Sequence, residues 1–332
     1  MQRILVIQTA FIGDAILGTS LLEKLHQEHP KAKVDYLVRN GNQSLFDGHP
    51  YLNEVLVWNK KQAKYSELVS VLKLVRSKNY DAVFNIQRYA ASGILTAFSG
   101  AKMKVGYKDN PLSFLFSKSV KHRFGNGFES VHEVDRVLDL VGEKPKRCLP
   151  RLFPTETDLN SVSEYKEKPF VTIAPASVWF TKQFPIEKWI EFVNEIPDTL
   201  NVLIIGAKSD QAIASEIQKH STREVTDLTG ILKLLQTAAL MKDAVMNYAN
   251  DSAPVHLASA VNAPITEVFC STIPEFGFTP LSEESSFIQT KEKLDCRPCG
   301  MHGKSACPKG HFKCAETIDV KEMLAAVAEY KA

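Results

Sequence analysis

Short apolar runs alternate, along the first part of the chain, with longer segments of mixed polarity. The runs ILVIQ at 4–8 and VDYLV at 34–38 flank a segment at 14–28 in which leucines recur at every fourth position. A continuous apolar run predicts a strand that is buried on both faces, whereas apolar positions spaced by four predict an amphipathic helix. The order strand, helix, strand indicates a βαβ unit with parallel strands.

The same alternation continues through most of the chain. In the first half, further strands are expected at 55–58 and 81–86 and a helix at 65–78. After position 169 a second series is expected, with strands at 170–174, 201–206, 244–249 and 265–270 and helices at 186–196, 209–219, 231–241 and 254–261. Each series is typical of a doubly wound α/β domain, so we expect two Rossmann-like domains that face each other across a cleft.

A proline-rich, charged segment at 145–169 separates the two series and is interpreted as the interdomain linker. The chain has 332 residues, 44% of them hydrophobic, which is enough to build two hydrophobic cores. We predict a first domain at 1–153 and a second at 154–314, which includes a cysteine-rich segment at 296–314. The last segment, 315–332, is predicted to form a helix that crosses back to the first domain.

Charge and hydropathy exclude several classes of partner. The formal net charge is only +2 and the basic residues are scattered, so the sequence does not indicate a nucleic-acid-binding surface. No apolar stretch approaches the roughly 18 residues of a membrane-spanning helix. Asp14 interrupts the N-terminal apolar region where a signal peptide would need an unbroken core. We therefore expect a cytoplasmic protein whose contact with a membrane is peripheral.

Asp14 follows the first predicted strand, where a helix is expected to begin. This turn lacks the repeated glycines of a dinucleotide-binding motif, which argues against a bound pyrophosphate here. One interpretation makes Asp14 a helix N-cap or first-turn acid, which stabilises a helix by roughly 0.5 to 2 kcal/mol. The other makes it a general base at the cleft, with Gly13 allowing a substrate hydroxyl to approach closely.

Ser177, Thr181 and Lys182 lie in a segment that leaves one predicted strand and enters a helix at about Pro185. Two hydroxyl groups, a lysine charge and the positive end of a helix dipole together suit a phosphate group. The alternative is an ordinary solvent-exposed lysine.

A second strand-to-helix connection, at 250–258, contains Asp251, Ser252 and His256 among small residues. The hydroxyl of Ser252 and the backbone N–H groups of 252–254 could hold a diphosphate. Alternatively, Asp251 caps the helix and His256 belongs to the core.

The string Gly303-Lys304-Ser305 resembles the end of a phosphate-binding P-loop. Pro298 stands where the first glycine of such a loop belongs, so the sequence does not predict a nucleoside triphosphatase.

Four cysteines cluster in the segment at 296–314, namely Cys296, Cys299, Cys307 and Cys314, with His302 and His311 nearby. A structural zinc site with four thiolates, or with three thiolates and one imidazole, is chemically reasonable. The second pair lacks the CxxC spacing of the first, so free thiols or disulfides remain the alternative.

Three segments together carry a resemblance to a known family. They contribute Gly13 and Asp14, then Ser177, Trp179, Lys182 and Pro185, and finally the string at 251–258 followed by Pro264, Phe269 and Thr272. From residue 3 to residue 314 the chain resembles glycosyltransferase family 9, the ADP-heptose:lipopolysaccharide heptosyltransferases, of the heptosyltransferase II type. This resemblance implies a GT-B fold, an N-terminal acceptor domain, a C-terminal donor domain, and inversion at the anomeric carbon without a metal.

The resemblance also assigns roles to individual residues. It makes Asp14 the catalytic base and Lys182 the catalytic lysine that contacts the donor phosphates. The donor-binding set is Ser177, Thr181, Lys182, Asp251, Ser252, Ala253, Pro254 and His256, and the acceptor-binding set is Gly13 and Arg88. Ala253 departs from the family, which usually has glycine at this position.

The partners implied are a nucleotide-diphosphate sugar, with ADP-heptose as the donor, and a lipid A/core oligosaccharide as the acceptor. The implied location is the cytoplasm or the inner face of the inner membrane. Two other functions remain open from the sequence: a nucleotide-sugar epimerase of the same fold, and a catalytically idle donor-binding protein that uses a zinc-dependent cysteine segment for interaction.

Overall fold

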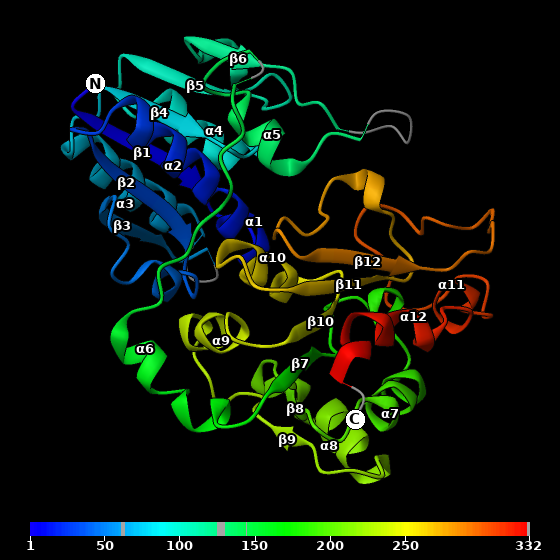
Figure 1. Ribbon diagram of the computed structural model, residues 1–332. Helices are drawn as coiled ribbons and strands as arrows, with labels where there is room; N and C mark the ends of the chain where they lie inside the picture. The colour runs from blue at the N-terminus through cyan, green and yellow to red at the C-terminus, as the bar shows by residue number, and fades with distance from the viewer. Residues whose placement is uncertain (61–63, 125–129, 144, 331–332) are drawn as a thin grey trace. The chain divides into compact units, whose positions relative to one another are not determined.

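The computed structural model describes residues 1–60, 64–124, 130–143 and 145–330, which form two compact units (Figure 1). Among the described residues, unit 1 extends to Phe153 except for Ser130, which is grouped with unit 2, and the rest of unit 2 begins at Pro154. This division falls within the segment that the sequence marks as a linker. None of the helices in the described ranges combines the length and apolar character that a membrane crossing requires.

Unit 1 is built on a six-stranded parallel sheet. Its strands are β1 (Arg3–Gln8), β2 (Lys33–Arg39), β3 (Leu52–Trp58), β4 (Ala82–Asn85), β5 (Met103–Tyr107) and β6 (Lys118–Val120). They lie in the order β3-β2-β1-β4-β5-β6, and each neighbouring pair is parallel. This is the strand order of a dinucleotide-type doubly wound fold.

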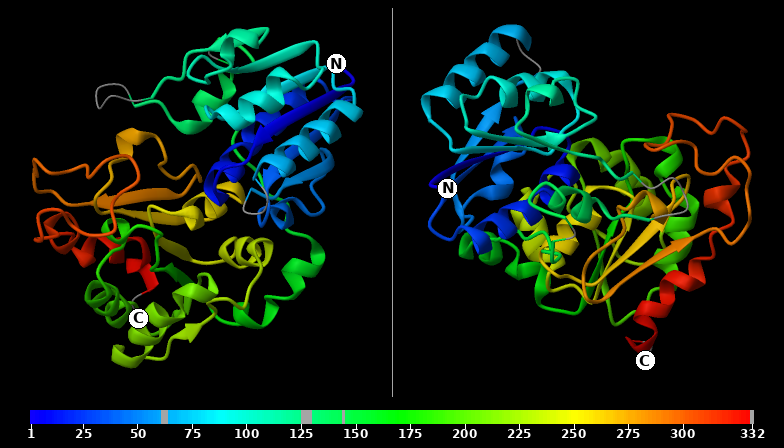
Figure 2. Two further views of the ribbon diagram at one scale, coloured as in Figure 1. Left: turned by 180° about the vertical axis from the view of Figure 1, so that it is seen from behind. Right: turned by 90° about the horizontal axis from the view of Figure 1, so that it is seen from above.

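Helices cover both faces of this sheet (Figures 1 and 2). They are α1 (Ile12–Leu17), α2 (Thr19–Glu28), α3 (Lys64–Ser77), α4 (Ala90–Ala97) and α5 (Glu133–Leu138), with 3-10 helices η1 (Gln43–Phe46) and η2 (Ser113–Leu115). Leu5 and Ile7 of β1 pack with Val71 of α3 and Leu95 of α4. Because side chains alternate along a strand, the equally buried residues between them face the opposite layer of helices.

The single helix predicted at 14–28 is divided at Gly18 into α1 and α2. The hydroxyl of Tyr36 donates to the carbonyl of Ala15 at 2.9 Å, and in an uninterrupted helix that carbonyl would accept from the N–H of residue 19. A Cβ at position 18 would lie 2.4 Å from the same hydroxyl, so only glycine leaves room for it. The division therefore depends on a residue of the neighbouring strand.

Unit 2 repeats the architecture. Its strands are β7 (Phe170–Ala174), β8 (Asn201–Ile204), β9 (Thr226–Asp227), β10 (Met246–Asn250), β11 (Ile265–Phe269) and β12 (Ser285–Gln289). Their order is β12-β11-β10-β7-β8-β9, all parallel, which is the order of unit 1 read from the opposite edge. The prediction of an α/β protein with two doubly wound parallel sheets is confirmed.

The helices of unit 2 are α6 (Glu156–Asn160), α7 (Ile186–Glu195), α8 (Gln211–His220), α9 (Leu234–Met241), α10 (Ala253–Ala260), α11 (Lys313–Glu316) and α12 (Val320–Leu324). Its 3-10 helices are η3 (Ser163–Lys166), η4 (Phe180–Lys182), η5 (Lys208–Asp210), η6 (Pro274–Phe276) and η7 (Ala325–Tyr330). Thus part of the predicted linker is helical, in α6 and η3. Residues Val171 and Ile173 of β7 share a core with Trp189 of α7 and Met323 of α12.

The C-terminal segment packs within unit 2. The carbonyl of Met323 accepts a hydrogen bond from the hydroxyl of Tyr248 at 3.0 Å, and that of Tyr330 accepts from the Thr199 hydroxyl at 2.8 Å. The helix predicted for this segment appears as α12 followed by η7, while residues 331–332 lie outside the described ranges. The crossing to the first domain stays a prediction.

Candidate functional site

In both units the expected site residues follow the two central strands. In unit 1 the chain continues from β1 toward one edge of the sheet and from β4 toward the other edge. In unit 2 it does the same from β7 and from β10. Such a switch point opens a crevice at the carboxyl ends of the strands, where ligands bind in doubly wound folds. Asp14 and Arg88 follow β1 and β4, whereas Lys182 and Asp251 follow β7 and β10.

Asp14 is a residue of the first turn of α1, whose N-cap is Phe11. It is therefore a first-turn acid and not the N-cap, and it and Gly13 are both partly exposed. Its charge raises the pKa of two buried groups, Glu133 and Tyr36, in each case after the larger effect of burial itself. A partly exposed carboxylate at a strand end suits proton transfer, and its helical position is compatible with that role.

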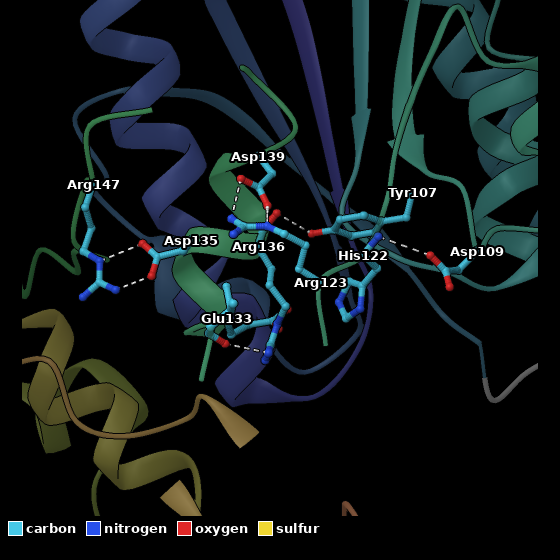
Figure 3. Close-up of polar contacts among 10 residues, drawn as sticks. Tyr107, Asp109, His122, Arg123, Glu133, Asp135, Arg136, Asp139 and Arg147 are labelled. Atoms are coloured by element: carbon cyan, nitrogen blue, oxygen red, sulfur yellow. Dashed lines mark hydrogen bonds and ion pairs between the residues drawn. The ribbon is translucent and has the colours of Figure 1, made fainter. Parts of the chain in front are cut away.

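Glu133 and Arg136 form a buried pair that sequence reasoning missed (Figure 3). Arg136 is fully buried, and its Nε donates to Glu133 Oε2 at 2.6 Å while its Nη1 donates to the carbonyl of Val131 at 2.7 Å. Burial and Asp14 raise the pKa of Glu133, and Arg136 and Arg88 oppose this rise. Asp14, Glu133 and Arg88 therefore belong to one electrostatic neighbourhood of unit 1.

Arg88 is exposed directly after β4, as an anion-binding residue would need to be. Burial, with Arg88 and Arg136, lowers the pKa of His122 to about 4 despite the opposing charge of Asp109, so this imidazole is neutral at pH 7. Arg123 makes two hydrogen bonds to Asp139, at 2.7 and 2.8 Å, and Arg147 pairs with Asp135 (Figure 3). Asp139 and Asp135 thus balance the charges of Arg123 and Arg147.

Lys182 and Asp251 form the central ion pair of unit 2. Lys182 Nζ lies 2.8 Å from Asp251 Oδ2, and the two side chains are only 15% and 11% exposed. The same carboxylate oxygen accepts from the hydroxyl of Thr272 at 2.5 Å. The switch point thus holds a lysine whose ammonium group is positioned by a partly buried partner, a suitable arrangement for a diphosphate.

Ser177 and Thr181 occupy different environments. Ser177 is partly exposed, and its carbonyl accepts from the side-chain amide of Gln183 at 2.6 Å. Thr181 is 1% exposed, and its hydroxyl oxygen accepts from Ser271 Oγ at 2.9 Å and from the N–H of Lys304 at 2.8 Å. The observed contacts give Thr181 a positioning role, and its direct contact with a donor stays a prediction.

The first turn of α10 lies beside this ion pair. Ser252 is the N-cap, with extended backbone angles of φ −157° and ψ 177°, and Ala253 and Pro254 are the first two helical residues. The Ser252 hydroxyl donates to the carbonyl of Asn250 at 3.1 Å, while His256 is buried within the helix. The backbone N–H groups of this first turn can donate hydrogen bonds to an anion, because the first N–H groups of a helix have no acceptor within the helix.

Glu267 of β11 is a second feature that sequence reasoning missed. It is fully buried, and neither carboxyl oxygen is hydrogen-bonded within the part of the chain that the structure describes. Burial raises its pKa well above the usual range, Asp251 adds to the rise, and Lys182 opposes it. Its place in an apolar strand gives no sequence signal, because only the fold brings it near the Lys182–Asp251 pair.

The cysteine-rich segment folds around the end of β11. The Arg297 guanidinium donates to the carbonyls of Cys270, Phe269 and Thr272. Cys296 Sγ lies 3.8 Å from His311 Nε2, and the four clustered thiols influence one another electrostatically. Within the described ranges, however, no three ligand side chains are grouped closely enough to hold a metal ion. A zinc site stays a prediction.

Known proteins resemble this chain in sequence and in fold. A family model described as glycosyltransferase family 9 (heptosyltransferase) matches residues 68–308. Lipopolysaccharide heptosyltransferase 3 of Escherichia coli strain K12 is 25% identical over 283 residues, which cover 78% of this chain and 80% of that protein.

Solved structures agree over the whole chain. The E. coli ADP-heptose LPS heptosyltransferase II superposes with a TM-score of 0.81 at 20% identity, covering 99% of this chain and 98% of that one. A family 9 glycosyltransferase from Veillonella parvula superposes with a TM-score of 0.85 at 18% identity, covering 99% and 97%. The predicted GT-B fold is confirmed.

Proposed function

The chain belongs to glycosyltransferase family 9, and on this premise we propose that it transfers a heptose from ADP-heptose to a lipid A-linked core oligosaccharide. The observation that carries the proposal is the pair of Lys182 and Asp251 at the switch point of unit 2. Relatives named lipopolysaccharide and lipooligosaccharide heptosyltransferases support the sugar and the acceptor class. A solved relative described with ADP-2-deoxy-2-fluoro heptose supports the donor class.

Unit 2 binds the donor. Lys182 contacts the diphosphate, and Ser252 together with the first-turn N–H groups of α10 supplies further hydrogen bonds. Ala253 replaces the usual glycine at the first helical residue, a position with ordinary helical backbone that alanine adopts without strain. The substitution is therefore compatible with an intact donor site.

Unit 1 binds the acceptor. Arg88 and Gly13 contact it, and Asp14 accepts the proton of the attacking hydroxyl. The acceptor oxygen then forms a bond to the anomeric carbon on the face opposite the leaving group, and the bond from that carbon to the diphosphate oxygen breaks. The diphosphate leaves with the electron pair, and the configuration at the anomeric carbon is inverted.

Protein groups stabilise the leaving diphosphate in this mechanism, so catalysis requires no metal ion. A lysine ammonium and helix N-terminal N–H groups place positive charge where negative charge develops. Groups fixed in this way stabilise the transition state without having to reorganise during the reaction. We place the reaction in the cytoplasm, with peripheral contact at the inner face of the inner membrane, because the acceptor carries a lipid.

Calorimetric titration with ADP, UDP and GDP tests the donor site. We expect ADP to bind in preference to the other two, and Lys182→Ala to weaken its binding. Asp14→Asn should leave the ADP affinity unchanged, because Asp14 acts on the acceptor. Binding of none of the three nucleotides, or binding that does not depend on Lys182, would contradict the proposal.

A further inference from the structure

The segment Cys299–Lys304 is joined to Thr181, the residue before Lys182, by hydrogen bonds that run directly through Lys304 and indirectly through Ser271. The N–H of Thr181 donates to the carbonyl of Lys304 at 3.1 Å, and the N–H of Lys304 donates to the Thr181 hydroxyl at 2.8 Å. Ser271, after β11, binds Thr181 twice, through its N–H at 3.2 Å and its hydroxyl at 2.9 Å. The N–H of Cys299 in turn donates to the carbonyl of Ser271 at 3.0 Å.

Gly303 lies against the side chain of Lys182. A Cβ built on Gly303 would lie 3.0 Å from Lys182 Cγ, 3.0 Å from Thr181 Oγ1 and 3.2 Å from Trp179 Cβ. Gly303 also has φ +76°, a backbone conformation that other residues rarely adopt. The glycine therefore serves two needs at once, since it forms the turn and leaves room for the lysine stem.

The side chain of Lys182 is thus held at both ends. Its stem passes Gly303 and its ammonium group meets Asp251 at 2.8 Å. A free lysine side chain loses rotamer entropy on binding, and a lysine that is already confined loses less. Confinement of this kind increases the affinity for an anion without adding a contact to it.

We propose that Thr181 and Gly303 are positioning residues that hold Lys182 for the donor diphosphate. This inference rests on the proposed function of Lys182. It also gives a role to the Gly303-Lys304-Ser305 string, whose backbone supports a phosphate-binding lysine although it forms no P-loop.

Gly303→Ala tests the inference, with Gly300→Ala as the matched control. Gly300 lies in the same segment with φ +92°, but a Cβ there meets nothing within 4 Å. We expect Gly303→Ala to raise the Kd for ADP and the donor KM roughly 2- to 10-fold. This is the size of effect expected when binding has to immobilise one additional long side chain. Turnover at saturating donor should fall as well, because the displaced lysine also stabilises the leaving diphosphate. Gly300→Ala should change neither the Kd for ADP nor the donor KM.

Two further variants separate positioning from general destabilisation. Thr181→Val removes the hydroxyl acceptor and should also raise the Kd for ADP, whereas Thr181→Ser keeps it and should restore the wild-type value. In the Lys182→Ala background, Gly303→Ala should have no further effect, because the residue it positions is gone.

The outcomes distinguish this inference from the function on which it rests. Equal effects of Gly303→Ala and Gly300→Ala, or no effect of either, would overturn the inference while a Lys182-dependent affinity for ADP still supported the donor site. An ADP affinity that does not change in Lys182→Ala would instead overturn the proposed function.

Discussion

Lys182 Nζ lies 2.8 Å from Asp251 Oδ2, and this carboxylate also accepts a hydrogen bond from Thr272 at 2.5 Å. In the proposed function the donor diphosphate meets a lysine that keeps this carboxylate as its partner. An ammonium group has three N–H donors, so Lys182 can donate to the diphosphate while one donor stays on Asp251. The buried carboxylate is then not left unpaired.

Removal of the lysine should affect both catalysis and stability. We expect Lys182→Ala to lower kcat/KM about 10²- to 10³-fold, the effect of removing one fixed donor from a developing negative charge. It should also lower the melting temperature, because Asp251 loses its cation. Steady-state kinetics and thermal unfolding measure the two effects. Lys188→Ala is the control, since Lys188 pairs with the exposed Glu191 on α7, and it should change neither quantity.

Asp14→Asn should separate binding from chemistry. The amide keeps the size of the side chain but cannot accept the acceptor proton, so we expect kcat to fall about 10²- to 10⁴-fold. Asp47→Asn, an exposed acid of the same unit, is the control for loss of one negative charge. A wild-type rate in Asp14→Asn would show that Asp14 has only the helix-stabilising role.

Glu267 should make the fold less stable as the pH rises. The unfolded carboxyl ionises near 4.5, whereas in the fold burial keeps its pKa well above that value. Above pH 4.5 the folded chain thus retains a proton that the unfolded chain releases, so its contribution to the free energy of unfolding falls by about 1.4 kcal/mol for each pH unit up to the folded pKa. Glu267→Gln removes this dependence.

Urea unfolding of wild-type and Glu267→Gln protein at pH 5 and pH 8 measures the effect. The stability of the variant relative to wild type should increase between the two values. Glu224→Gln, an exposed glutamate of unit 2, should show no such change. Parallel behaviour of wild type and Glu267→Gln at both pH values would mean that Glu267 ionises in the fold at an ordinary pKa.

Cys307 should be the first cysteine of the cluster to react with iodoacetamide at pH 7. Partial burial raises its pKa, but the backbone N–H groups of Phe312, Lys309, Gly310 and His311 together outweigh this and lower it. Burial raises the pKa of Cys314 to about 11, so that thiol should react last. Mass spectrometry of the alkylated peptides ranks the two, and faster labelling of Cys314 would contradict the assignment.

Metal analysis of the purified protein decides between the two interpretations of the cysteine cluster. One zinc per chain, lost in Cys296→Ser and Cys314→Ser, would establish a structural zinc site in this segment. Metal-free protein whose four thiols all react with iodoacetamide would establish free cysteines.

The sequence predicted the central buried strands well, because a short apolar run bounded by turn residues is typical of a buried strand. It did not reveal β5, β6, β9 or β12. The strands β6, β9 and β12 lie at sheet edges, β6 has three residues and β9 two, and β5 and β12 begin with partly or fully exposed residues. Edge strands need less apolar surface than central ones, so their pattern is weak. The division between α1 and α2 at Gly18 could not be predicted either, because it depends on Tyr36, which lies on β2.

The candidate site shows the same limit. Asp14, Lys182 and Asp251 could be selected because each follows a strand and belongs to a family pattern. Glu133 and Glu267 could not, since their unusual environments arise from contacts made only in the fold. Gly303 stood out in the sequence because Gly303-Lys304-Ser305 resembles the end of a P-loop. In the fold this glycine instead lies against Lys182.

The two sheets share one strand order, and the candidate residues follow the same two strands within that order. In the proposed function, recognition of the sugar nucleotide and recognition of the acceptor are thus encoded in separate halves of the gene. A change in one specificity need not disturb the other, so evolution can exchange acceptors while the donor half is retained. Recombination at the boundary between Phe153 and Pro154 would be the natural route to such hybrids.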